Sequence, residues 1–81
     1  MGKYRTKLLG YLQETLKSTE RTRCLLLQAY GHYYVRRDFI RTMHTIGMLE
    51  NCLRWYQLED RLLAYRFRRE VESDLEYQWN Q

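Results

Sequence analysis

A broad apolar stripe runs through residues 20–46, whose sequence is ERTRCLLLQAYGHYYVRRDFIRTMHTI. Its apolar residues recur every three or four positions, which is the period of a helix with one face in a protein core. The stripe keeps its phase across Gly31, so the pattern predicts one helix over residues 20–46 with Gly31 as a weak point. The members of the stripe are Leu25, Leu26, Ala29, His32, Tyr33, Val35, Phe39, Ile40, Met43 and Ile46.

Gly47 follows the stripe directly, and glycine is common after a helix end because it adopts left-handed backbone conformations without strain. A second helical pattern then covers residues 48–77. Its apolar side chains occupy most of the helix circumference, which is typical of a helix with neighbours on several sides. A turn at Gly47 would make these two helices an antiparallel hairpin.

A shorter amphipathic pattern covers residues 3–17, and Ser18 and Thr19 then break it because both are good helix caps. The sequence therefore predicts an all-α protein, with a long antiparallel helical hairpin plus a shorter N-terminal helix. This is a three-helix bundle in one domain over residues 1–81, which dimerisation could complete.

The amino-acid composition and the missing motifs limit the kinds of function that we expect of this chain. The chain has 81 residues, of which 44% are hydrophobic and 30% charged, and it has no run of about 20 apolar residues that could cross a membrane. Cys24 and Cys52 lack metal-site spacing, and no signal-peptide pattern follows Met1, so we expect a reducing, cytoplasmic location. No phosphate loop, nucleophile elbow or zinc motif is present, so we expect no enzyme activity, metal or cofactor.

Charge is distributed unevenly along the chain. Residues 1–69 hold all 14 Lys and Arg against six acids, a net of +8, whereas residues 70–81 hold four acids and no base. Arg54, Arg61 and Arg68 recur at seven-residue spacing, so they could form a ridge that contacts nucleic acid phosphates. The alternatives are that this ridge is a solvated face and that the acidic tail folds back on the basic body.

Two charges interrupt the apolar faces of the predicted hairpin. Arg36 falls within the stripe of the first long helix, and Asp60 falls within the main apolar arc of the second. An unpaired charge is costly at such a position, so a turn at Gly47 predicts an Arg36–Asp60 ion pair across the hairpin. Both side chains could instead reach the rim of the interface.

The predicted helix lengths leave one end of the hairpin open. The N-terminal helix spans about 22 Å and its long neighbour about 39 Å. The uncovered end would carry Met43, Trp55 and Leu58, which are therefore expected to bind a second copy or another protein. The alternative is that the N-terminal segment folds differently and covers this end.

A second predicted partner surface combines tyrosine and arginine. Tyr30 and Tyr34 lie on the side of the long helix away from its core stripe, with Arg37 and Arg41 beside them. Tyrosine and arginine are enriched in interface hot spots. The alternative is that these tyrosines pack on the N-terminal helix or the acidic tail.

One weak family resemblance was considered. Tyr4-Arg5 followed by Leu8-Leu9, with Phe39 later in the chain, resembles the LYR family of mitochondrial assembly factors. Lys3 stands in place of the family's leading leucine, and Tyr4 and Phe39 are farther apart than the family's spacing. The chain is therefore not assigned to that family.

The sequence predicts a small intracellular protein–protein interaction module that acts as a regulator, inhibitor, chaperone or assembly subunit. Its partner would be a second copy or another protein, with no membrane involved. The alternative is a nucleic-acid-binding regulator that uses the arginines. Binding to phosphates would weaken steeply with salt, whereas an apolar interface would not.

Overall fold

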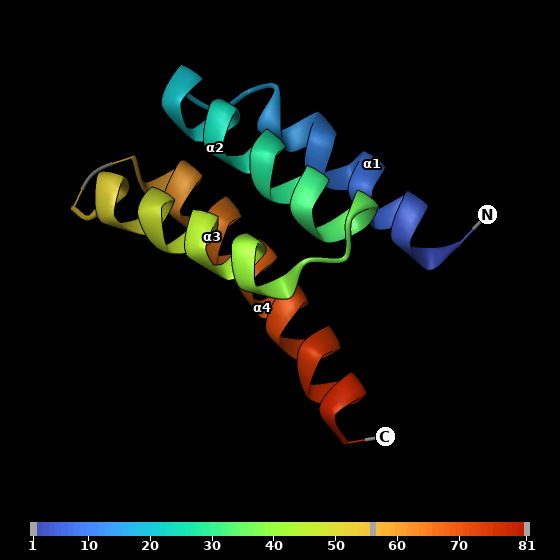
Figure 1. Ribbon diagram of the computed structural model, residues 1–81. Coiled ribbons are helices and arrows are strands. Elements are labelled where there is room, and N and C mark those ends of the chain that lie inside the picture. The colour runs from blue at the N-terminus through green and yellow to red at the C-terminus, as the bar shows by residue number, and fades with distance from the viewer. Residues whose placement is uncertain (1, 56, 81) are drawn as a thin grey trace.

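The computed structural model describes residues 2–55 and 57–80, which form four α-helices and one π-helical segment (Figure 1). No strand occurs in these two ranges, and the predicted all-α class is confirmed. The helix boundaries, however, differ from the predicted ones. The elements are α1 (Lys3–Thr15), α2 (Glu20–Tyr30), η1 (Gly31–Val35), α3 (Phe39–Leu53) and α4 (Leu58–Trp79).

The helix predicted over residues 20–46 is interrupted, so that prediction is wrong. The backbone widens into the π-helical η1, and Arg37 then adopts a left-handed φ of 54°. The Asp38 carboxylate accepts a hydrogen bond from the backbone N–H of Arg41 at 3.0 Å and caps the start of α3. Asp38 was the available signal for this break, because aspartate favours N-caps over helix interiors.

The turn predicted at Gly47 is also wrong, because Gly47 lies inside α3. The chain reverses between α3 and α4, where Arg54 and Gln57 have positive φ angles of 28° and 60°. Neither residue is glycine, and few non-glycine residues adopt such angles. The sequence therefore offered no conventional turn signal at this place.

Successive helices run antiparallel, and α1 also packs on α4, which closes the bundle (Figure 1). Aromatic rings fill its centre. The Phe67 ring lies 4.9 Å from that of Tyr30, 5.4 Å from that of Tyr11 and 5.7 Å from that of Tyr33, in edge-to-face contacts. Fully buried aliphatic side chains surround this cluster and include Leu26, Ile46, Leu49 and Val71.

The open hairpin end predicted from the helix lengths does not form. The long helix is split, and α1, α2 and α3 have comparable lengths of 13, 11 and 15 residues. Leu49 and Leu53 are buried, while Phe39 and Met43 are partly buried against the core. Among the described residues of this region, four apolar side chains are exposed, namely Val35, Ile40, Trp55 and Leu58.

The predicted Arg36–Asp60 ion pair is absent. Asp60 is 7% exposed and accepts hydrogen bonds from the backbone N–H and hydroxyl of Thr19, at 3.2 and 2.7 Å. Arg36 is exposed in the turn after η1 and takes part in none of the ion pairs among residues 2–55 and 57–80. The predicted pair depended on a turn at residue 47, and the actual turn changes which residues face each other.

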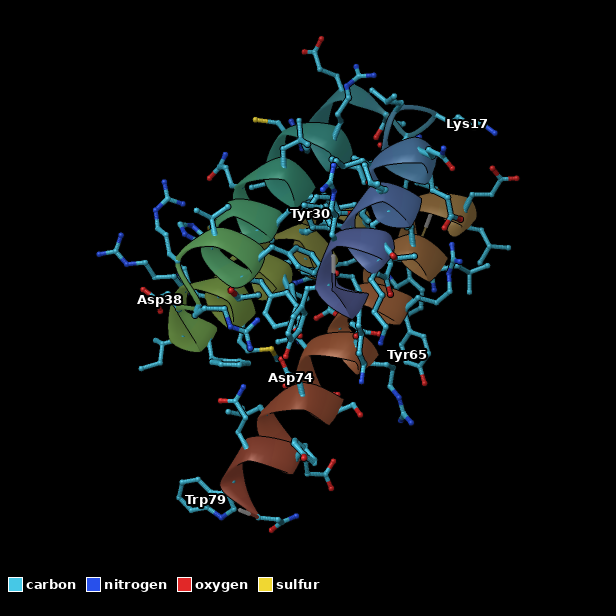
Figure 2. All side chains as sticks on the ribbon, turned by 90° about the vertical axis from the view of Figure 1, so that its right-hand side faces the viewer. Lys17, Tyr30, Asp38, Tyr65, Asp74 and Trp79 are labelled. Carbon is cyan, nitrogen blue, oxygen red and sulfur yellow. The ribbon has the colours of Figure 1, made fainter. Side chains whose placement is uncertain are left out.

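The first part of the acidic tail folds back on the basic body, as the alternative interpretation proposed. Two carboxylates of α4 form ion pairs with bases on other elements: Glu70 with Lys7 at 2.6 Å and Asp74 with Arg37 at 2.8 Å. Glu72 pairs with Arg68 at 3.2 Å within α4 itself. Beyond Asp74 the helix projects past the bundle, and Trp79 lies at its far end (Figure 2). We call residues 75–80 the overhang.

Candidate protein-docking surface

The two tyrosines of the predicted Tyr/Arg surface belong to the core. Tyr30 is 3% exposed, and its hydroxyl lies 2.7 Å from the Thr15 hydroxyl on α1. Burial raises the pKa of Tyr30 to about 12, although the Thr15 hydrogen bond acts in the opposite direction. Tyr34 is partly buried and its ring contacts those of Tyr30 and Tyr33. The alternative interpretation, packing on the N-terminal helix, is therefore the correct one.

Arg37 is a structural residue in this fold. Its guanidinium lies 4.6 Å from the centre of the Tyr4 ring and 4.9 Å from that of the Tyr33 ring. The Asp74 carboxylate accepts hydrogen bonds from Arg37 at 2.8 Å, from the Tyr33 hydroxyl at 2.6 Å and from the Tyr4 hydroxyl at 3.1 Å. This cluster, which we call the Asp74 cluster, joins α1, η1 and α4.

Opposing effects act on the pKa of Asp74. Burial alone would raise it, but the hydrogen bonds from Tyr33, Arg37 and Tyr4 outweigh burial and hold the pKa below its ordinary value. The ionised form is therefore the one that the cluster stabilises. Arg41 has a local role, because it lies 3.5 Å from the Asp38 carboxylate within the first turn of α3.

The predicted arginine ridge is not continuous. Arg54 lies in the turn before α4, whereas Arg61 and Arg68 lie on α4 itself. Arg68 is held by Glu50 at 2.6 Å and by Glu72 at 3.2 Å. An arginine already neutralised by two carboxylates contributes little to phosphate binding, so the geometry favours a structural role for Arg68.

The outer side of α4 carries an exposed apolar surface. Leu58, Leu62 and Tyr65 follow i, i+4 and i+7 spacing on this side and are 61%, 51% and 53% exposed. Trp55, in the turn that leads into α4, is 88% exposed. We call these four residues the α4 patch. Contiguous exposed apolar side chains of this kind typically mark protein interaction sites.

The α4 patch borders a shallow groove between α3 and α4. Leu53 and Ala64 form its floor, and Leu58, Leu62 and Tyr65 line its side. Three arginines lie close to the patch along the chain, namely Arg54, Arg61 and Arg69. None of the three forms an ion pair in the described part of the chain. Two acids lie nearby: Glu59 is exposed, and Glu50 lines the groove but is paired with Arg68. The surface is therefore apolar at its centre and predominantly basic at its rim.

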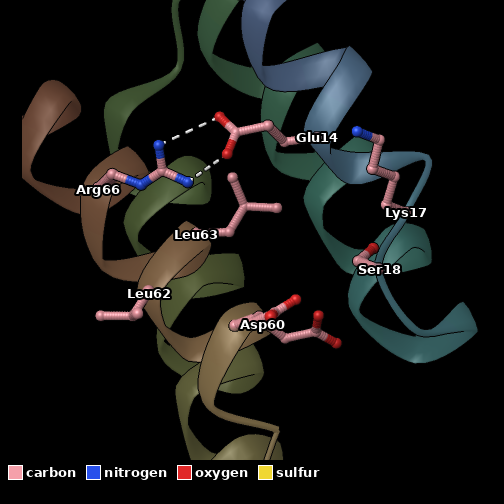
Figure 3. Close-up of a pocket in the computed structure, with 8 residues that line it drawn as sticks. Glu14, Lys17, Ser18, Asp60, Leu62, Leu63 and Arg66 are labelled. Carbon is pink, nitrogen blue, oxygen red and sulfur yellow. Dashed lines mark hydrogen bonds and ion pairs between the residues drawn. The ribbon is translucent and has the colours of Figure 1, made fainter.

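A second groove lies between α1 and α4, on the other side of Leu62 (Figure 3). Arg66 bridges it by donating to the Glu14 carboxylate at 2.5 and 3.2 Å. Leu62 and Leu63 both line this groove, and Leu63 is the one that points toward α1. The paired charges make this groove a contact between α1 and α4, so the α4 patch is the better candidate for a partner.

The overhang is a second exposed apolar feature of α4. Leu75 and Trp79 are one helical turn apart and are 39% and 85% exposed. Glu72 and Glu76 lie beside them, and these four residues line one shallow surface. The sequence pattern had identified Trp55 and Leu58, but Leu62, Tyr65 and the overhang were not selected as partner-binding residues. The signal for Leu62 and Tyr65 was that apolar side chains occupy most of the circumference of the helix predicted over residues 48–77.

Several other kinds of site are missing from residues 2–55 and 57–80. No group of three or more His, Cys, Asp and Glu side chains there is placed to hold a metal ion. No helix in these ranges is both long enough and apolar enough to span a bilayer. Cys24 is exposed and Cys52 partly buried, and both are free thiols.

Comparisons with known proteins were made against family models, curated proteins and solved structures. No family model matches the chain, no curated protein matches it, and no solved structure matches it.

Proposed function

We propose that the protein is a protein–protein interaction module whose α4 patch binds an acidic amphipathic helix of its partner. The single observation that carries this proposal is the exposed apolar row of Leu58, Leu62 and Tyr65 with its basic rim. Amphipathic helices commonly bind such grooves by inserting side chains spaced i, i+3, i+4 and i+7. The basic rim selects a helix that carries carboxylates beside its apolar face.

The nucleic-acid alternative has less support from the geometry. Arg54 and Arg61 are separated by a turn, and Arg68 is engaged by Glu50 and Glu72. Four exposed apolar side chains at the centre of the surface also suit a protein partner better than a phosphate backbone. Regulation, inhibition or assembly of the partner would each follow from such binding.

Trp55 provides a direct readout of binding. In the Trp79→Phe variant, Trp55 is the remaining tryptophan, and its emission should shift to the blue when an acidic amphipathic peptide covers it. The matched control peptide replaces each Glu with Lys and should not bind. Leu62→Lys should abolish binding, whereas Ile40→Lys, at a position 85% exposed on α3, should leave it unchanged.

Two results would contradict the proposal. One is equal binding of the acidic and the basic peptide, which would mean that the arginine rim selects nothing. The other is a lack of any response to the peptides combined with tight, steeply salt-dependent binding of an oligonucleotide, which would favour the nucleic-acid alternative.

A further inference from the structure

We infer that the acidic helix that binds the α4 patch is the overhang of a second copy of this chain, so that two α4 helices pack antiparallel about a twofold axis. This inference rests on the proposed function and names its partner. Two exposed surfaces of the molecule have complementary chemistry. The α4 patch is apolar with a basic rim, and the overhang is apolar with Glu72 and Glu76 beside Leu75 and Trp79.

The contact must join two molecules. The patch and the overhang lie on the same helix, and Leu62 and Leu75 are about 20 Å apart along it at 1.5 Å per residue. A continuous helix cannot bend its own end back onto its middle. Three of the four acids in residues 70–80 are already paired within the molecule, namely Glu70, Glu72 and Asp74. Glu76 forms no ion pair in the described part of the chain, so it provides the counter-charge for Arg61 of the second copy.

One antiparallel register satisfies both surfaces together. When Leu58 lies opposite Trp79 of the second copy, Leu62 comes level with Leu75 of that copy and Arg61 with its Glu76. Tyr65 then lies level with Glu72 of the second copy. Near the axis Arg69 lies level with Arg68 of the second copy. Glu50 and Glu72 already pair with Arg68 within each molecule and so reduce the repulsion between these arginines.

Twofold symmetry makes each of these contacts occur twice and closes the assembly at two copies. Both overhangs and both patches are covered in one contact along the full length of α4. A head-to-tail arrangement would leave one patch and one overhang exposed and would extend into a filament. The closed dimer therefore buries more of the exposed apolar surface per copy.

The test is sedimentation equilibrium of the full chain over micromolar to millimolar concentrations. We expect a reversible dimer of the 10.1 kDa chain. Arg61→Glu or Glu76→Arg alone should each raise the dissociation constant about tenfold, because each places like charges opposite one another at two symmetric positions. The double variant Arg61→Glu with Glu76→Arg should restore the wild-type constant. Arg21→Glu, at an exposed position on α2, is the matched control and should leave the constant unchanged.

A chain that stays monomeric at every concentration would overturn the inference, as would a double variant no tighter than the two single variants. If the monomer still binds the acidic peptide at Trp55, the proposed function stands and only the second copy is wrong as the partner. If neither the second copy nor the peptide binds, both proposals are wrong.

Discussion

The Asp74 cluster makes a quantitative prediction about stability. The Asp74 side chain is 11% exposed and that of its partner Arg37 is 34% exposed, so the pair lies between a buried and a surface ion pair. Breaking a buried pair from one side costs about 3–5 kcal/mol, and losing a surface pair costs under about 1 kcal/mol. Asp74→Asn should therefore lower the free energy of unfolding by about 2 kcal/mol, which corresponds to a fall in Tm of roughly 10–15 °C for a domain of this size.

Thermal and urea unfolding followed by circular dichroism at pH 7 measure this difference. The matched control is Glu76→Gln, because it neutralises an exposed carboxylate two residues further along the same helix. The control should stay within about 0.5 kcal/mol of the wild type under conditions that keep the chain monomeric.

The pH dependence of the difference follows from the lowered pKa of Asp74. A carboxyl with a depressed folded-state pKa contributes stability above its ordinary unfolded-state pKa and loses that contribution as the pH falls through its folded-state pKa. The gap between wild type and Asp74→Asn should thus be full at pH 7 and close below pH about 4. A variant as stable as the wild type at pH 7, or a gap that persists unchanged at low pH, would refute the role assigned to the cluster.

Three further stability predictions use the same unfolding measurements. Gly47→Ala should stabilise the protein by about 0.5–1 kcal/mol, because Gly47 lies in the interior of α3 and nothing within 4 Å would meet the added Cβ. If Gly47 formed a turn, the same change would destabilise the fold. Asp60→Ala should destabilise by about 2 kcal/mol because the Thr19 backbone N–H and hydroxyl lose their acceptor. Arg36→Met should change stability by less than about 0.5 kcal/mol, and a larger loss would indicate a charged partner that the described structure does not contain.

The helical class could be predicted because the apolar period survives in every segment of the chain. The boundaries could not, because the period also continues through the break between η1 and α3. The π-helical segment and the turn together preserve the spacing of the apolar residues, so that spacing does not reveal the break. Asp38 was the one residue whose capping preference contradicted the continuous helix.

The turn between α3 and α4 was predicted at the wrong residue, Gly47. Gly47 was taken as a helix terminator, yet it is helical, while Arg54 and Gln57 adopt the positive φ angles. Packing of the flanking helices determines that turn, and packing cannot be deduced from local residue preferences. Once the turn moved, the facing residues changed, and the predicted partner of Asp60 changed from Arg36 to Thr19.

The candidate surface was predicted in part. The helix lengths predict Trp55 and Leu58 at an uncovered end, and both are exposed although that end does not form. The predicted exposure of Tyr30 and Tyr34 is wrong for two reasons. Tyr34 lies in η1, whose wider backbone shifts the helical phase. Tyr30 lies in α2 itself and is buried between Thr15 of α1 and Phe67 of α4, because the core is broader than the apolar stripe indicates. The overhang could not be predicted because Leu75 and Trp79 are exposed only where the neighbouring helices end. The sequence pattern of α4 does not show where those helices end.

The most direct test of the antiparallel α4 dimer is a cross-link between two copies at the position where their α4 helices should meet. With Cys24→Ser and Cys52→Ala removing the native thiols, a chain carrying Leu58→Cys is mixed with a chain carrying Trp79→Cys under mild oxidation. A disulfide forms only between residues whose Cα atoms come within about 7 Å. The antiparallel α4 dimer predicts a mixed disulfide dimer in good yield and little dimer when Ile40→Cys replaces Leu58→Cys as the first chain. Equal yields from the two mixtures, or no mixed dimer from Leu58→Cys and Trp79→Cys, would contradict it.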